Sequence, residues 1–150
     1  MIKILLTGSD GQLGQAIVRE NVKNVELIKT TRKDLNLLHP SECYEMVKKL
    51  KPDWIINTAA YTDVEKAEID IKKAFKVNCE AVRQFAIALK EFGGRILHIS
   101  TDFVFDGRQN IPYLPSSKKN PLNVYGKSKA AGEEEIKKIL RNTDQGIILR

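Results

Sequence analysis

Short apolar segments alternate along this chain with longer amphipathic segments, and this alternation is what most constrains the fold. The apolar segments are residues 2–7, 25–29, 53–57, 95–100 and 146–149, and the helical patterns between them cover residues 12–21, 40–50, 71–92 and 124–140. Continuous apolar runs are typical of strands that are buried on both faces. Strand–helix alternation gives parallel units with right-handed crossovers. The sequence therefore predicts an α/β fold with a doubly wound parallel sheet, in strand order 3-2-1-4-5.

Length and composition fit one ordinary domain. The chain has 150 residues, of which 42% are hydrophobic and 29% charged, and this is enough for a single core. No apolar run reaches the roughly 18 residues that a membrane span needs. The segment from Met1 to Gly8 is typical of a first strand, not of a signal peptide. We therefore expect one cytoplasmic domain over residues 1–150 with no membrane partner.

Charge and cysteine patterns exclude several further classes of protein. The net charge is +6, but lysines are interleaved with glutamates, as in residues 133–138, so we expect no nucleic-acid partner. Cys43 and Cys79 both fall in predicted helices, and we expect no disulfide between them. Neither cysteine has metal-ligand spacing with His39 or His98, so we expect no metal site.

Three glycines follow the first predicted strand directly and open the first predicted helix. They are Gly8, Gly11 and Gly14, in the spacing G-x-x-G-x-x-G, which differs from the common G-x-G-x-x-G. A sharp turn at Gly8, close approach of a pyrophosphate at Gly11 and close helix packing at Gly14 would each explain why glycine is needed. The helix N-terminus would then offer N–H groups to phosphates. This context predicts a Rossmann-like domain that binds a dinucleotide.

The end of the second strand bears on the choice of cofactor. An acid there would hold the 2′-hydroxyl of NAD, but the chain instead continues Lys29-Thr30-Thr31-Arg32. Lys29 or Arg32 could pair with a 2′-phosphate, and no acid stands there to repel it. We therefore expect NADPH to be preferred, with NADH as the other cofactor to test. The alternative is that Arg32 points into solvent.

A phenol and an ammonium stand four residues apart at Tyr125 and Lys129, which places them on one face of a helix. A nearby ammonium favours the phenolate and brings tyrosine toward a useful acid–base range. Thr101 follows the fourth strand, at the sheet edge where ligands of open α/β sheets bind. A hydroxyl there could hold a carbonyl oxygen beside Tyr125, so the three residues form a candidate catalytic set.

These elements, in this order, resemble the extended branch of the short-chain dehydrogenase/reductase superfamily, and within it the dTDP-4-dehydrorhamnose reductases. The resemblance is carried by residues 6–14, 53–62, 99–107 and 121–133. It spans essentially the whole chain, but only the first half of such an enzyme. One departure follows Thr62, where the family usually has a small residue and then Val-Asp-Lys, whereas this chain has Asp63-Val64-Glu65-Lys66.

The resemblance implies a role for each matching residue. It implies that Thr101, Tyr125 and Lys129 are catalytic, with Tyr125 and Lys129 also at the cofactor. The other implied cofactor-binding positions are Gly8, Gly11, Gln12, Leu13, Gly14, Asp34, Leu35, Ala59, Ala60 and Thr62, to which the residue pattern adds Arg32. The implied substrate-binding positions are Val64, Asp102 and Phe103.

The resemblance also implies a reaction, namely NAD(P)H-dependent reduction of the C4 keto group of dTDP-4-dehydrorhamnose to dTDP-L-rhamnose, with Tyr125 as proton donor. A dTDP-sugar would be the substrate partner. The chain stops at Arg150, after an apolar strand with no following helix. We therefore expect a domain truncated before the substrate-binding part, which binds cofactor but reduces substrate poorly. The oligomeric state, including a homodimer, stays open.

Three other functions deserve comparison. Sugar-nucleotide dehydratases commonly have an Asp-Glu pair after the threonine, whereas Asp102 is followed here by Phe103, so dehydration is disfavoured. Epimerases of the same branch stay open, because their distinguishing features lie in the missing half. A non-catalytic protein that resembles the regulatory subunit of methionine adenosyltransferase is the alternative from another class. The complete set of Thr101, Tyr125 and Lys129 favours an enzyme.

Overall fold

A parallel five-stranded sheet forms the centre of the molecule in the computed structural model, which describes residues 1–20 and 22–150. The strands are β1 (Ile2–Thr7), β2 (Val25–Thr30), β3 (Trp54–Asn57), β4 (Arg95–Ile99) and β5 (Gly146–Leu149). The helices are α1 (Gln12–Arg19), α2 (Pro40–Leu50), α3 (Val64–Ala67), α4 (Ile71–Phe75), α5 (Ala81–Phe92) and α6 (Val124–Ile139). A π-helical turn, η1 (Lys76–Glu80), joins α4 to α5, and a 3₁₀ turn, η2 (Asp102–Val104), follows β4.

The predicted strands and helices are all present, and their outer ends differ from the predictions by at most two residues. The single helix predicted over residues 71–92 is, however, divided into α4, the π-helical turn η1 and α5. The helix predicted over residues 12–21 ends at Arg19, and residue 21 lies outside the described residues. The short helix α3 and the turn η2 were not predicted. Within residues 1–20 and 22–150, no helix is both long enough and apolar enough to cross a bilayer.

The sheet confirms the doubly wound parallel α/β class, but the predicted strand order 3-2-1-4-5 is wrong. The observed order is β2-β1-β3-β4-β5, because β3 pairs with β1 and not with β2. The exposed charged residues Glu26 and Lys29 make β2 suitable as an edge strand, whereas the apolar β3 fits the centre. The direction of winding therefore reverses between β1 and β3, and ligands of open α/β sheets bind at such a point.

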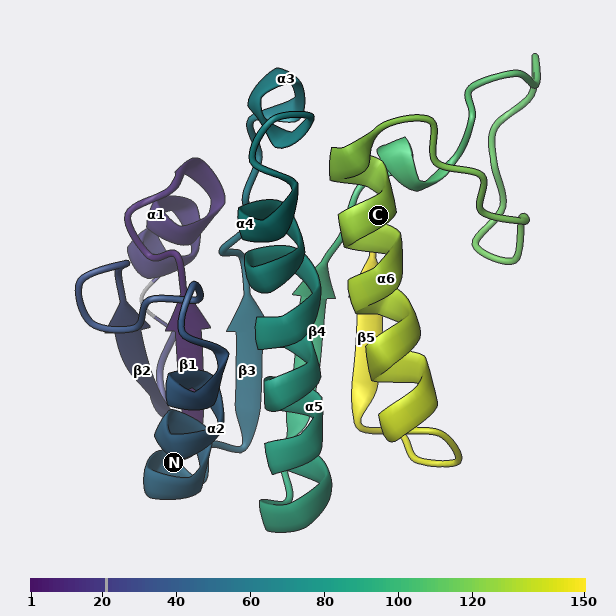
Figure 1. The fold of residues 1–150 in the computed structure, drawn as a ribbon. Helices are drawn as coiled ribbons and strands as arrows, with labels where there is room; N and C mark the ends of the chain where they lie inside the picture. The colour runs from purple at the N-terminus through teal and green to yellow at the C-terminus, as the bar shows by residue number, and fades with distance from the viewer. Residues whose placement is uncertain (21) are drawn as a thin grey trace.

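The reversal places helices on both faces of the sheet. With right-handed crossovers, α1 and α2 lie on opposite faces because the chain moves in opposite directions after β1 and after β2. Helices α2, α5 and α6 pack side by side on one face, in front of the strands in Figure 1. The carboxyl ends of the strands point toward the edge at which α3 and the start of α6 lie (Figure 1). The loops that follow the strands and the N-termini of several helices therefore lie together at this edge.

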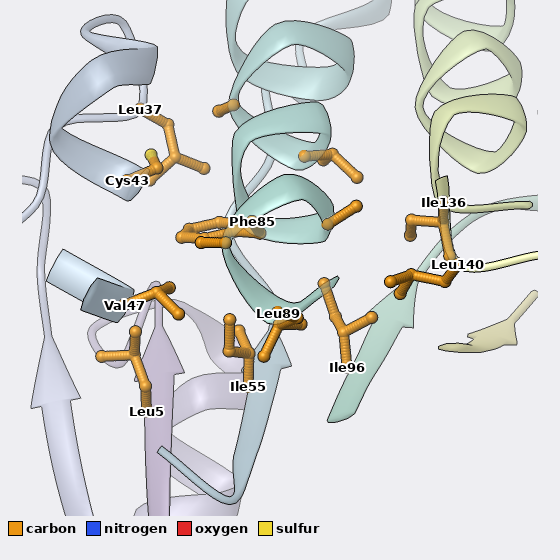
Figure 2. Close-up of a cluster of buried hydrophobic side chains, with 14 of the residues drawn as sticks. Leu5, Leu37, Cys43, Val47, Ile55, Phe85, Leu89, Ile96, Ile136 and Leu140 are labelled. Carbon is orange, nitrogen blue, oxygen red and sulfur yellow. The ribbon is translucent and has the colours of Figure 1, made fainter. Parts of the chain in front are cut away.

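The main hydrophobic core lies between the sheet and these three helices. Phe85 of α5 lies at its centre and is fully buried (Figure 2). Around it lie fully or nearly fully buried side chains from the sheet and from α2, α5 and α6: Leu5, Val47, Ile55, Leu89, Ile96, Ile136 and Leu140. Each large apolar side chain contributes roughly 1.5–3 kcal/mol when fully buried. This core fixes α6, and therefore the catalytic candidates on it, against β4 and β5.

The opposite face of the sheet is covered less completely. On β5, Ile147 is 46% exposed and Leu149 is 55% exposed, although both faces of parallel sheets are normally buried. In the sheet, Ile147 is paired with Leu97 of β4, and Leu97 is paired with Ile56 of β3. These three strands therefore present a continuous apolar strip.

This strip predicts the solution behaviour of residues 1–150. We expect the chain to bind a hydrophobic dye and to self-associate, because contiguous exposed apolar surface promotes both. The double variant I147T/L149T should reduce dye binding and association without lowering the melting temperature, since threonine keeps its preference for strands. Ile148, between these two residues, packs against the core instead. The matched control I148T should therefore lower the melting temperature. Unchanged dye binding and association in I147T/L149T would contradict this account of the strip.

Candidate functional site

The glycine turn has the geometry that makes glycine necessary at two positions. Gly8 has a φ of +65°, and a Cβ there would lie 3.0 Å from the backbone N and Cα of Ala59. At Gly14, a Cβ would collide with the carbonyl oxygen of Gly8 and with the Cα of Ser9. The sequence suggested that Gly14 lets α1 pack closely against the sheet. In the structure, Gly14 instead lets α1 pack closely against the glycine turn. The Gly11 amide closes the turn by donating to the Gly8 carbonyl oxygen over 3.0 Å.

The N-terminus of α1 faces the same turn. Gly11 is its N-cap residue and provides no side-chain cap, so the first-turn N–H groups have no partner from that residue. The Gln15 side chain braces the turn by donating from Nε2 to the Asp10 carbonyl oxygen over 2.7 Å. Free N–H groups and the partial positive charge of a helix N-terminus favour a bound anion. The turn is therefore well suited to a phosphate group.

A cavity of about 780 Å³ opens between this turn and the loop after β3, where the winding reverses. Eight of the predicted cofactor-binding residues line it: Gly8, Gly11, Gln12, Arg32, Leu35, Ala59, Ala60 and Thr62. The cavity wall also includes residues that the sequence did not indicate: Asp10, Thr31, Asn36, Leu37, Leu38, Thr58, Tyr61, Lys66, Asp70, Lys73 and Val77. Its size falls in the range of small-molecule and cofactor sites.

Five predicted cofactor-binding residues do not belong to this wall: Leu13, Gly14, Asp34, Tyr125 and Lys129. Gly14 lies behind the turn, and Leu13 is 44% exposed. The Asp34 carboxylate accepts hydrogen bonds from the Thr31 amide, over 2.8 Å, and from the Thr31 hydroxyl, over 2.7 Å. These bonds lower the pKa of Asp34. The side chain of Asp34 therefore shapes the loop after β2, and its contact with a nucleotide stays a prediction.

The catalytic candidates Thr101 and Tyr125 lie at neighbouring element ends. Asn123 caps α6 by accepting a hydrogen bond from the Gly126 amide over 2.7 Å, which places Tyr125 in the first turn. Thr101 follows β4 and caps η2, with its Oγ1 accepting from the Phe103 amide over 3.2 Å. The rings of Phe103 and Tyr125 meet edge to face, with centroids 5.5 Å apart. One end of α6 and the end of β4 thus bring together two catalytic candidates and one substrate-binding candidate.

Lys129 lies one turn further along α6 and is only 2% exposed. Its Nζ donates to the Ile99 carbonyl oxygen over 2.6 Å and lies 3.4 Å from Nε2 of His98. Burial lowers the pKa of Lys129 to about 8, and the charge of Glu133 opposes part of this effect. Among the described residues, no hydrogen bond joins Lys129 to the Tyr125 hydroxyl. The ammonium is therefore tied to the end of β4.

A row of buried polar side chains below the site was missed by sequence reasoning. Thr7, Asn57 and His98 occupy paired positions on β1, β3 and β4. The Thr7 hydroxyl donates to Asn57 Oδ1 over 2.6 Å, and Asn57 Nδ2 lies 2.9 Å from His98 Nδ1. Burial, together with the nearby charge of Lys129, lowers the pKa of His98 to about 3, so the ring is neutral. The row connects the strand before the glycine turn to Lys129.

Asn78 is a second residue that sequence reasoning missed. It lies buried in the π-helical turn η1, where its Oδ1 accepts from the Tyr61 amide over 2.8 Å and its Nδ2 donates to the Tyr61 carbonyl oxygen over 3.0 Å. The same Nδ2 lies 3.0 Å from the Ser128 Oγ on α6. Asn78 thus joins the loop that lines the cavity to the helix that carries Tyr125. A polar residue within an otherwise helical pattern was its only signal.

The departure from the family pattern after Thr62 has a structural explanation. Asp63 caps α3, and its Oδ1 accepts from the Lys66 amide over 3.0 Å. Val64, a predicted substrate-binding residue, begins this helix, which contacts the start of α6. Glu68, just after α3, accepts a hydrogen bond from the Val124 amide over 2.7 Å. Asp63 therefore acts as a helix cap that helps to position the segment containing Val64.

Several known proteins resemble this chain in sequence and in overall fold. The chain is 38% identical to a dTDP-4-dehydrorhamnose reductase of Aggregatibacter actinomycetemcomitans, over all of this chain and 51% of that protein. The crystal structure of a dTDP-4-dehydrorhamnose reductase of Clostridium acetobutylicum superimposes with a TM-score of 0.91 at 36% identity, over 98% of this chain and 52% of that one. The crystal structure of a dTDP-4-dehydrorhamnose reductase of Bacillus anthracis in complex with NADP superimposes with a TM-score of 0.89 at 31% identity. The match covers 99% of this chain and 52% of that one.

The chain spans about half the length of these relatives. A family model described as "RmlD substrate binding domain" matches residues 2–150, which is nearly the whole chain. The chain therefore belongs to the RmlD substrate binding domain family.

Proposed function

We propose that this chain is the cofactor-binding half of an NADPH-dependent dTDP-4-dehydrorhamnose reductase and that it carries the catalytic residues. The observation that supports this most is the 780 Å³ cavity at the winding reversal, bounded by the glycine turn. Thr101 and Tyr125 stand on the neighbouring element ends. Relatives of that name, one of them solved with NADP, favour this reaction and this cofactor.

The residues present fit a nicotinamide dinucleotide. Gly8 and Gly14 let the turn close where a Cβ would collide with neighbouring backbone, and the N-terminus of α1 would hold the pyrophosphate. Ala59 and Ala60 line the cavity with small side chains beside the turn. When bound, the dinucleotide supplies the hydride for reduction of the C4 carbonyl carbon.

The catalytic candidates have complementary tasks. Tyr125 would donate its phenolic proton to the carbonyl oxygen at C4, and the Thr101 hydroxyl would orient that oxygen by a hydrogen bond. The Lys129 ammonium, one turn away, would favour the phenolate that remains after proton donation. Phe103 and Asp102 flank Tyr125 and Thr101 on the exposed side, where a sugar nucleotide would approach.

Arg32 should decide the preference between NADPH and NADH. It lines the cavity just after β2, and no carboxylate occupies the position at the end of that strand. A hydrogen bond to a charged group contributes about 1.5–3 kcal/mol, so R32A should weaken NADPH binding by about 10- to 100-fold. NADH binding should be nearly unchanged. Calorimetry with both cofactors checks this prediction, and equal losses for both would show that Arg32 does not contact the 2′-phosphate.

The reaction itself needs an activity test. The full-length protein, meaning the complete gene product that contains this chain, should oxidise NADPH when dTDP-4-dehydrorhamnose is added. Residues 1–150 alone should bind NADPH but turn over poorly. NADPH binding by the full-length protein without any turnover would contradict the proposed reaction and favour a regulatory nucleotide-binding protein.

A further inference from the structure

Glu133 of α6 is a charged residue for which the proposed mechanism has no task. Its side chain is fully buried, and a buried carboxylate is costly unless it is paired and hydrogen-bonded. Its Oε1 accepts from the Ser100 hydroxyl over 2.5 Å and from Arg150 Nε over 2.8 Å. Its Oε2 accepts from Arg150 Nη2 over 2.7 Å and from Lys119 Nζ over 3.1 Å. Every lone-pair direction of this carboxylate is therefore used.

The three donors come from three separate segments around the catalytic candidates. Ser100 is the residue immediately before Thr101, Lys119 lies in the loop that leads to α6, and Arg150 follows β5. Arg150 also donates from Nη1 to the Pro115 carbonyl oxygen over 2.9 Å, which ties the same loop a second time. Glu133 therefore joins the end of β4, the end of β5 and the loop between β4 and α6.

The charge of Glu133 also acts on Lys129. The two residues are four apart on α6, so they share a face of the helix. Among the described residues, the other ionisable groups around this pair are His98 on β4, which is neutral, and Tyr125 on α6, while Arg150 is paired with Glu133 and Lys119 with both Glu133 and the exposed Glu134. Among these groups, Glu133 is therefore the negative charge that favours a buried ammonium.

Glu133 stays ionised at any ordinary working pH. Burial alone would raise the pKa of Glu133, but hydrogen bonds from Arg150, Ser100 and Lys119 outweigh burial and lower the pKa to about 2. The bidentate contact with Arg150 is the strong, directional kind of carboxylate pair. The negative charge of Glu133 near Lys129 is therefore present throughout the ordinary pH range.

We propose that Glu133 is a positioning residue for the proposed reduction: through Ser100 it holds Thr101 at the end of β4, and through its charge it keeps Lys129 an ammonium. This role rests on the proposed function, but both of its physical parts can be measured in the chain without turnover. Two neutralising variants with opposite expected effects separate the proposal from general destabilisation.

The first measurement is the pKa of Lys129 by NMR in residues 1–150. E133Q removes a negative charge and should lower the pKa of Lys129 by about one pH unit or more. R150Q removes a positive charge that partly neutralises Glu133, so it should raise the pKa of Lys129. Melting curves will show that both variants are folded at the temperature of the titration. Shifts in the same direction, or no shift in E133Q, would overturn the electrostatic part of the proposal.

The second measurement separates position from charge in the full-length protein. S100A removes the hydrogen bond to Glu133 but leaves the carboxylate in place. It should lower kcat about tenfold or more with little change in KM for NADPH, and it should leave the alkaline limb of the pH–rate profile where it is. E133Q should also lower kcat and should move that limb to lower pH. An unchanged kcat in S100A would overturn the positioning part. Complete inactivity of the unmodified protein would instead disprove the proposed function, with the NMR result still valid.

Discussion

Replacing Tyr125 with phenylalanine is expected to lower kcat of the full-length protein by about 10²–10⁴-fold, the usual contribution of a positioned proton donor. The ring should stay in place, because its edge-to-face contact with Phe103, at 5.5 Å between centroids, does not involve the hydroxyl. The melting temperature should therefore change little. Steady-state oxidation of NADPH with the keto sugar nucleotide measures the effect.

A matched tyrosine provides the control for this variant. Tyr44 lies on α2, where its hydroxyl donates to Glu91 over 2.7 Å, on a helix that is not part of the site. Y44F removes a hydrogen-bonded hydroxyl of the same kind and should leave kcat unchanged. If Y125F kept more than about a tenth of the activity, the proton would have to come from another group.

Replacing Gly14 with alanine should abolish tight cofactor binding. The new Cβ would collide with the Gly8 carbonyl oxygen and with the backbone of Ser9, neither of which can move without opening the turn. Loss of two hydrogen bonds to a phosphate, at about 1.5–3 kcal/mol each, corresponds to a loss of affinity of about 100-fold or more. Calorimetric titration of residues 1–150 with NADPH measures this loss.

Gly93 offers the matched glycine control. Its φ is +88°, so alanine is strained there, but a Cβ would meet no atom within 4 Å. G93A should therefore cost some stability and leave NADPH binding unchanged. If G14A bound NADPH as tightly as the unmodified chain, the glycine turn could not be the phosphate site.

The sequence predicted the elements well because their signals are local. Strands such as β1 and β4 are mostly apolar, and α5 ends at Phe92, before Gly93, where the predicted helix ends. Strand order is a long-range property and was predicted wrongly. The expectation followed the commonest arrangement of such folds, whereas the charged residues Glu26 and Lys29 of β2 already favoured an edge strand.

The parts of the site that lie in contiguous sequence motifs could be predicted from the sequence. Gly8 and Tyr125 are recognisable because their neighbours in sequence are also their neighbours in space. Asn78, His98 and Glu133 act through contacts with residues 14 to 50 positions away, and a single sequence does not indicate such contacts. Asp34 was assigned to the cofactor by resemblance, but its carboxylate is occupied by Thr31.

NADPH titration of residues 1–150, followed residue by residue by NMR, tests the central claim most directly. The account predicts saturable binding at one site, tighter for NADPH than for NADH. The largest amide shifts should occur in the glycine turn from Gly8 to Gly14 and in the cavity loop from Ala59 to Thr62. A folded chain whose amides in these two segments do not respond to either cofactor would contradict it.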